Sequence, residues 1–306
     1  MTSEYSKEEI TQYYDRISIP EALRIYDVSE LSPKAALSYL KELQKHHLVS
    51  VPFENISLHY SPSRTVILHP DQLFRKIVHG GRGGYCMELN AVFGVLLRSL
   101  KYNLYPTGAR VHDGREFGGW DHMLNLVSIG DSRYVVDVGF GSNYVPTAPL
   151  RLIHDAAGVP NVAPASVRLV YKNIDRSLNP YQKIWVFQHR ISDNSEFKDM
   201  YSFTDTEFRS RDFEIMNFWT SKSPSVIFTQ RLICNKMILG QGEKDKEIVG
   251  TMTLMGELKR RIGAKSEVLK EFKTEKERIA ALSEEFGITL SEIEKEAIRG
   301  TACEIR

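Results

Sequence analysis

The sequence predicts an α+β multi-domain protein, because its hydrophobic pattern changes twice along the chain. Residues 1–100 are mostly helical in their spacing, and residues 101–210 carry short β-rich runs separated by Gly, Pro, Asn and Asp. Residues 211–306 mix strand-like pieces with a charged helical stretch. We therefore expect a helical bundle, an antiparallel β-barrel or curled sheet, and an α/β module. No internal repeat or long linker is visible between them, so these modules are expected to pack together.

The first module carries helix signals on both sides of a glycine-rich interruption. Ser32 and Pro33 have the residue types of an N-cap and a first helical position, and apolar residues then recur at helical spacing. The run Gly80–Gly84 breaks this pattern, which resumes from Leu89 onward. Cys86 is therefore expected near the start of a helix.

The second module contains a hairpin that can bring a histidine and an aspartate together. The β-rich stretches on either side of Gly130-Asp131-Ser132 are typical of two antiparallel strands. With a two-residue loop, Leu124 lies opposite Asp137, and His122 is its diagonal neighbour on the same face. A three-residue loop would put His122 and Asp137 on opposite faces, so this expectation depends on the loop length.

In the third module we expect strands at Val226–Leu232 and Lys236–Leu239 and a helical stretch around Glu267–Phe286. The chain as a whole has 40 basic and 39 acidic residues and a formal charge of +1, so its net charge does not favour nucleic acid or an anionic membrane. Three cysteines, widely spaced and odd in number, form neither a disulfide framework nor a metal motif. With no apparent signal peptide or membrane span, we expect a cytoplasmic protein that binds small molecules.

The segment Arg82–Glu88 is the most informative part of the chain. At a helix start, unpaired backbone N–H groups and the helix dipole favour the thiolate of Cys86 over the thiol. The preceding glycines allow the backbone to approach a ligand closely. Taken alone, the pattern fits a small buried cysteine beside an ordinary loop equally well.

A thiol nucleophile gains most from an imidazole that is itself held by a carboxylate. His122 and Asp137 meet this requirement if the hairpin has the expected register. Among the other histidines, the pattern alone leaves His59, His79 and His189 open. No dinucleotide fingerprint or phosphate loop is present, because Gly139-Phe140-Gly141 lacks the third glycine and does not lead into a helix.

Four motifs, in order, resemble the arylamine N-acetyltransferase family. Arg82–Glu88 matches its nucleophile motif RGGxCxE, and Pro52–Asn55 resembles its upstream PFEN motif. Asp121–Met123 and Val136–Gly141 are similar to its histidine and aspartate segments. Weaker likenesses are Tyr14–Ile17, Asn217–Trp219 and Pro224-Ser225.

This resemblance implies a helical bundle, a β-barrel and an α/β lid, with a cysteine-protease-like triad of Cys86, His122 and Asp137. It also implies a two-step transfer of an acyl group from an acyl-CoA co-substrate, without a metal, to an arylamine, arylhydrazine or related xenobiotic amine. For the substrates, the resemblance points to the following residues: Phe140 and Tyr144 at the amine pocket, and Gly119, Trp120 and Ser142 in the loops that approach CoA and acceptor.

Four further points complete the expectations. Glu54 and Arg82 should form a structural ion pair joining the PFEN segment to the nucleophile loop. The acyl donor stays open between acetyl-, propionyl- and malonyl-CoA, and a malonyl donor would need a cation such as Arg110 or Arg115 near the acyl end. The chain is expected to be a monomer. Two other classes share the pattern: a thiol hydrolase or amidase with the same triad, and a CoA-binding relative without activity.

Overall fold

The computed structural model describes residues 4–241 and 247–305. Its first part is helical, with longer helices α1 (Lys7–Arg16), α2 (Pro33–Ser50) and α4 (Cys86–Ser99) and the shorter α3 (Pro70–Phe74). Two short 3₁₀ helices, η1 (Glu21–Leu23) and η2 (Ile56–Leu58), lie among them, and the π-helix η3 (Arg75–His79) directly continues α3. Ser32 caps α2 through the backbone N–H of Ala35, with Pro33 in the first turn, so this helix start is confirmed.

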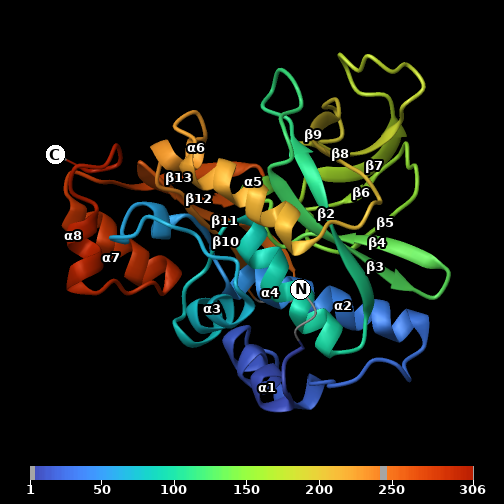
Figure 1. The fold of residues 1–306 in the computed structure, drawn as a ribbon, viewed down its shortest axis with the longest axis horizontal. Coiled ribbons are helices and arrows are strands. Elements are labelled where there is room, and N and C mark those ends of the chain that lie inside the picture. Colours follow the sequence, from blue (N-terminus) through green and yellow to red (C-terminus); the bar gives the residue numbers. More distant parts are fainter. Residues whose placement is uncertain (1–3, 242–246, 306) are drawn as a thin grey trace.

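An eight-stranded antiparallel sheet follows, in the order β5-β4-β3-β2-β9-β8-β7-β6. Its strands are β2 (Asn103–Val111), β3 (His122–Ile129), β4 (Ser132–Val136), β5 (Leu150–Arg151), β6 (Val159–Pro160), β7 (Ser166–Lys172), β8 (Ile184–Arg190) and β9 (Lys198–Phe203). Figure 1 shows that this sheet is strongly curved, so that it has a concave inner face. Within the described ranges β5 and β6 are its two edges, so the expected barrel is a curled, open sheet.

The hairpin between β3 and β4 has the register expected for a two-residue loop, which is one of the two alternatives that the sequence left open. Ile129 pairs with Ser132 and Asn125 with Val136, which leaves Gly130 and Asp131 as a two-residue loop. Continuing this register places Leu124 opposite Asp137. The condition for bringing His122 and Asp137 onto one face is therefore fulfilled.

The second sheet has five strands in the order β1-β10-β11-β12-β13. Four come from the C-terminal part, β10 (Cys234–Leu239), β11 (Ile248–Met255), β12 (Glu257–Ile262) and β13 (Lys265–Glu271), whereas β1 (Phe53–Glu54) comes from the PFEN segment. This segment thus ties the first module to the last. The domain boundaries at residues 100 and 210 stay a prediction.

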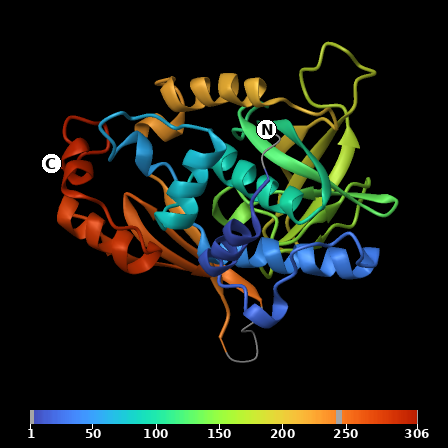
Figure 2. The same ribbon diagram turned by 60° about the horizontal axis from the view of Figure 1, so that its bottom comes forward.

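The remaining helices are α5 (Ser210–Lys222), α6 (Ile227–Gln230), α7 (Glu275–Phe286) and α8 (Glu292–Ala297). The strand expected at Val226–Leu232 is wrong, because this segment turns into α6, where Thr229 donates its hydroxyl hydrogen to the carbonyl of Ser223. Figure 2 shows α5 crossing above α4, with α7 and α8 at the far end from the eight-stranded sheet. None of the described helices has the length and apolar character needed to span a membrane.

Candidate active site

Cys86 is the first residue of α4, a helix of 14 residues. The helix start is held by Glu88, whose Oε2 accepts the backbone N–H of Tyr85 at 3.0 Å. Cys86 itself is only 4% exposed. Its Sγ lies 3.7 Å from the carbonyl oxygen of Asp121, the residue before β3. The expected helix-start position of the thiol is thus what the structure shows.

The aspartate segment closes over the start of α4. A Cβ on Gly139 would lie 2.8 Å from Cα of Cys86, so a side chain at this position would collide with backbone. The side-chain amide of Asn90, one turn after Cys86, donates to Oδ1 of Asp137 at 2.9 Å and to the carbonyl of Met123 at 2.7 Å. Asn90 therefore joins the helix to both β-segments.

His122 and Asp137 form a direct contact, with 2.8 Å between Nε2 and Oδ2. Both are buried, at 2% and 0% exposure. The second oxygen of Asp137 accepts the N–H groups of Asn90 and Gly139. Because Nε2 of His122 is hydrogen-bonded to Asp137, Nδ1 is the ring nitrogen that can interact with Cys86. The structure therefore brings the three predicted residues together.

The pKa values of His122 and Asp137 depend on each other. Burial alone would lower the pKa of His122, but the carboxylate of Asp137 and the contacts with Cys86 outweigh it and raise the pKa to about 10. Burial would raise the pKa of Asp137, yet the charge and the hydrogen bond of His122 hold it below its usual value. The imidazole of His122 is therefore held in its protonated form beside the carboxylate of Asp137.

Tyr201 is a neighbour that the sequence pattern did not identify. Its ring lies 5.1 Å from that of His122, on the inner face of the curled sheet. Burial, followed by the carboxylate of Asp137, raises the pKa of its hydroxyl well above the usual value. Asn90 was missed as well, although its spacing of four residues from Cys86 on a helix was a usable signal. Tyr201 reaches the site only through strand pairing and had no such signal.

Two buried carboxylates and two partly buried cations surround the loop that precedes Cys86. Arg82 lies 3.2 Å from Glu54, with 12% and 0% of their side chains exposed, so the expected ion pair is present. Lys76 lies 2.7 Å from Glu88 and 3.7 Å from Glu54. Burial would raise the pKa of Glu54, but Arg82 and then Lys76 outweigh it and lower the pKa. The carboxylate also accepts the backbone N–H of Gly83, which fixes the loop beside Cys86.

The residues expected to bind substrate fall into two groups. Phe140 packs on the inner face of the sheet, 5.3 Å from the His122 ring and 4.9 Å from the Tyr201 ring. Tyr144 lies in the short helix η4 (Ser142–Tyr144), 37% exposed, 4.9 Å from the ring of His189. The side chain of Ser142 lies outside the described residues.

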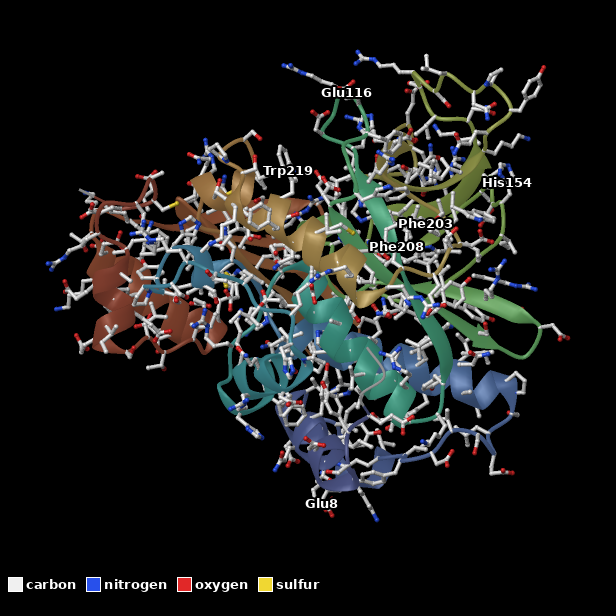
Figure 3. All side chains as sticks on the ribbon, in the orientation of Figure 1. Glu8, Glu116, His154, Phe203, Phe208 and Trp219 are labelled. Carbon is white, nitrogen blue, oxygen red and sulfur yellow. The ribbon has the colours of Figure 1, made fainter. Side chains whose placement is uncertain are left out.

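Gly119 and Trp120 line a mostly apolar cavity of about 600 Å³ between the loop before His122 and α5. Figure 3 labels Phe208 and Trp219, two aromatic residues that line the same cavity. α5 contacts the residue before Cys86 through Asn217, which accepts a hydrogen bond from the hydroxyl of Tyr85.

The two arginines considered for a malonyl group differ in their position relative to this cavity. Arg110 lies 4.2 Å from the Trp120 ring, whereas Arg115 is exposed on the loop after β2.

A family model described as N-acetyltransferase matches residues 36–295. The chain belongs to the arylamine N-acetyltransferase family. It is accordingly an acyltransferase. Among its relatives, the N-malonyltransferase FDB2 of Fusarium pseudograminearum is 36% identical over 320 residues, covering 96% of this chain and 92% of that protein. Arylamine N-acetyltransferase 2 of Mus musculus is 31% identical over 270 residues, covering 84% and 89%.

Solved structures of the family share the fold. The arylamine N-acetyltransferase of Salmonella typhimurium superposes with a TM-score of 0.78 at 23% identity, covering 96% of this chain and 98% of that one. The Mycobacterium marinum enzyme in complex with CoA gives a TM-score of 0.75 at 23% identity, covering 96% and 99%. Across residues 4–241 and 247–305, no group of three or more His, Cys, Asp or Glu side chains could hold a metal ion.

Proposed function

We propose that this family member transfers a short acyl group from coenzyme A to an arylamine, with Cys86 as the residue that carries the acyl group. The observation that supports this most is the contact series at the start of α4. Cys86 lies beside His122, and Nε2 of His122 lies 2.8 Å from Asp137. A nucleophile, a base and a group that orients the base are the parts that acyl transfer through a covalent intermediate needs.

In the first step, the sulfur of Cys86 bonds to the carbonyl carbon of the acyl-CoA, and the bond from that carbon to the CoA sulfur breaks. The leaving sulfur takes a proton from His122. In the second step, the amine nitrogen attacks the same carbon, His122 accepts the amine proton, and Cys86 leaves as thiolate. Asp137 stabilises the charged imidazole and fixes its orientation in both steps.

The cavity between Gly119-Trp120 and α5 is our candidate site for part of the CoA. It lies beside the loop that leads into His122, and its lining is mostly apolar, which suits the uncharged arm of CoA. The arylamine would instead approach over Phe140 and Tyr144 on the inner face of the sheet. In this proposal CoA and the arylamine reach Cys86 from different sides, and CoA leaves before the amine attacks.

The proposal leaves three acyl donors to be distinguished by experiment. Relatives of the chain include both N-malonyltransferases and N-acetyltransferases, so acetyl-, propionyl- and malonyl-CoA are all candidates. Of the cations considered for a malonyl carboxylate, Arg110 is the one next to the cavity residue Trp120.

The test is intact-mass measurement after exposure to each of the three donors, followed by addition of aniline. We expect one acyl group per chain, stable in buffer and released as the N-acyl arylamine when the amine is added. A thiol hydrolase would instead lose the group to water without amine, and a relative without activity would never gain it. The burial of Cys86 favours the transferase, because it limits access of water to the thioester.

A further inference from the structure

Glu88, two residues after Cys86, contacts a cation that the proposed function does not use. Its carboxylate has two partners, since Oε2 accepts the backbone N–H of Tyr85 at 3.0 Å and Oε1 lies 2.7 Å from Nζ of Lys76. The first contact caps the helix that begins with Cys86. The second contact neutralises a carboxylate whose side chain is only 2% exposed.

The backbone on both sides of this ion pair is closely packed. Lys76 belongs to the π-helix η3, and its carbonyl oxygen accepts the N–H of Arg82 at 3.2 Å. Short π-helical segments are rare and often occur at functional sites. A Cβ on Gly84 would lie 2.7 Å from Cβ of Glu88, so the Glu88 side chain packs directly against the loop before the helix. Both partners are thus held by contacts that a change of the Lys76 side chain leaves intact.

Lys76 is the cation that neutralises Glu88. Among the described residues, Arg82 forms ion pairs with Glu54 and Glu294, each at 3.2 Å, and none with Glu88. Lys76 lies 1.0 Å closer to Glu88 than to Glu54, at 2.7 Å against 3.7 Å. The two carboxylates beside the loop therefore have different cations, Arg82 for one and Lys76 for the other.

The charge of Glu88 depends on this contact. Burial raises the pKa of the Glu88 carboxyl, Lys76 acts against this rise, and the like charge of Glu54 adds to it. The titratable residue Tyr85 stays neutral, because burial raises the pKa of its hydroxyl well above the usual value. Without Lys76, a charged Glu88 would be an unpaired anion two residues from Cys86, and a nearby anion disfavours a thiolate.

We propose that Lys76 is a positioning residue for Cys86: it neutralises Glu88, so that the helix start is capped without a net negative charge beside the thiolate. His122, itself bonded to Asp137, supplies the positive charge that the thiolate needs, and Lys76 prevents Glu88 from opposing it. This inference rests on the proposed function, from which it takes only that Cys86 is the nucleophile.

The test measures alkylation of Cys86 by iodoacetamide in the full chain, from about pH 6 to about pH 9, with peptide mapping to identify the modified residue. In Lys76→Met the pKa of Glu88 should rise further, since buried glutamates can reach about 8–9. Below that pKa Glu88 is neutral, and the variant should react at the wild-type rate. Above it, the rate relative to wild type should fall about 10-fold, because the unpaired anion opposes the thiolate.

Two further variants separate charge from packing. Lys76→Arg keeps the cation, and the double variant Lys76→Met/Glu88→Gln removes both charges while its amide oxygen can still accept the N–H of Tyr85. For both, the rate relative to wild type should not change with pH. Lys45→Met is the matched control, because Lys45 on α2 is 18% exposed against 19% for Lys76 and lies 2.6 Å from its partner Glu42.

A packing role for Lys76 gives a different result. It predicts a loss in Lys76→Met that is the same at every pH, or one that Glu88→Gln does not relieve, and either result would overturn the inference. If Lys76→Met does not fold, a folded double variant with a pH-independent rate ratio supports the inference. A double variant that also fails to fold overturns it.

Alkylation needs neither an acyl donor nor an amine, so its outcome can be separated from the proposed function. If the pH-dependent loss and its relief occur but no arylamine is acylated, the proposed function fails while the role of Lys76 stands. If arylamines are acylated and Lys76→Met reacts like Lys45→Met at every pH, the role of Lys76 is wrong and the proposed function stands.

Discussion

Two buried cysteines in this chain lie in opposite electrostatic surroundings. Cys86 begins α4, beside an imidazole that is bonded to a carboxylate, whereas Cys234 begins β10 inside the apolar core of the second sheet. Burial, followed by the nearby charge of Glu54, raises the pKa of Cys234 well above its usual value. Both thiols are almost inaccessible, at 4% and 0% exposure. The comparison therefore predicts that Cys86 and not Cys234 serves as the nucleophile, because the two thiols differ in their partners and hardly in their exposure.

The largest expected effect comes from removing the imidazole at Cys86. In His122→Gln, acylation of the cysteine should slow about 100-fold to 10,000-fold, because the leaving thiol loses its proton donor. Single-turnover kinetics with acyl-CoA measure this step. His69→Gln changes an exposed histidine and serves as the control. Near-normal acylation in folded His122→Gln would remove the distinction between Cys86 and Cys234.

A smaller loss, of about 100-fold in kcat/KM, is expected for Asp137→Asn. An amide cannot stabilise the charged imidazole, and it can hold the ring in the wrong tautomer. The lost charge should also let the pKa of His122 fall from about 10, since Asp137 is what raises it. NMR titration of the His122 ring is the check. An unchanged titration would show that Asp137 is a core residue of the hairpin and no part of the active group.

Arg82→Ala tests the charges that hold the nucleophile loop in place. Removing Arg82 leaves the buried carboxylate of Glu54 with Lys76 alone, 3.7 Å away. We expect the free energy of unfolding to drop by about 3 kcal/mol. Urea unfolding measures this change, with the exposed Arg75→Ala as the matched variant. Equal unfolding curves for the two variants would mean that the pair contributes nothing to the loop.

The smallest effect concerns pH and a histidine away from the site. Burial, followed by the charge of Arg16, lowers the pKa of His47 to about 3. The unfolded chain therefore binds a proton that the folded chain rejects, and this stability is present above about pH 6.5 and is lost as the pH falls toward 3. Between pH 7.5 and pH 5 the loss should be about 2 kcal/mol. Urea unfolding at both pH values should show a loss on acidification that is about 2 kcal/mol larger in the wild type and in His69→Gln than in His47→Phe, because the other histidines contribute equally to all three proteins.

Local patterns predicted much of this fold. The cap at Ser32 and the helix start at Cys86 depend on neighbours close in sequence, and both are present. For the hairpin the sequence left two loop lengths open, and the structure has the two-residue loop. The pairing of β1 with β10 was not predicted, because it depends on contacts between residues far apart. The helix α6 was not predicted either, and besides its local hydrogen bond to Ser223 it has a distant contact, in which the side-chain amide of Asn55 donates to the carbonyl of Phe228. Tyr201 reaches His122 in the same way, through strand pairing. A cytoplasmic location and a monomeric state stay predictions.

The most direct test of the central claim is to find the residue that carries the acyl group. After reaction with acyl-CoA in the absence of amine, peptide mapping by mass spectrometry should place the added mass on Cys86, with none on Cys234 or Cys303. The group should then appear in the N-acyl product when an arylamine is added. Added mass on a different residue, or amide formation at the wild-type rate by Cys86→Ala, would contradict the account.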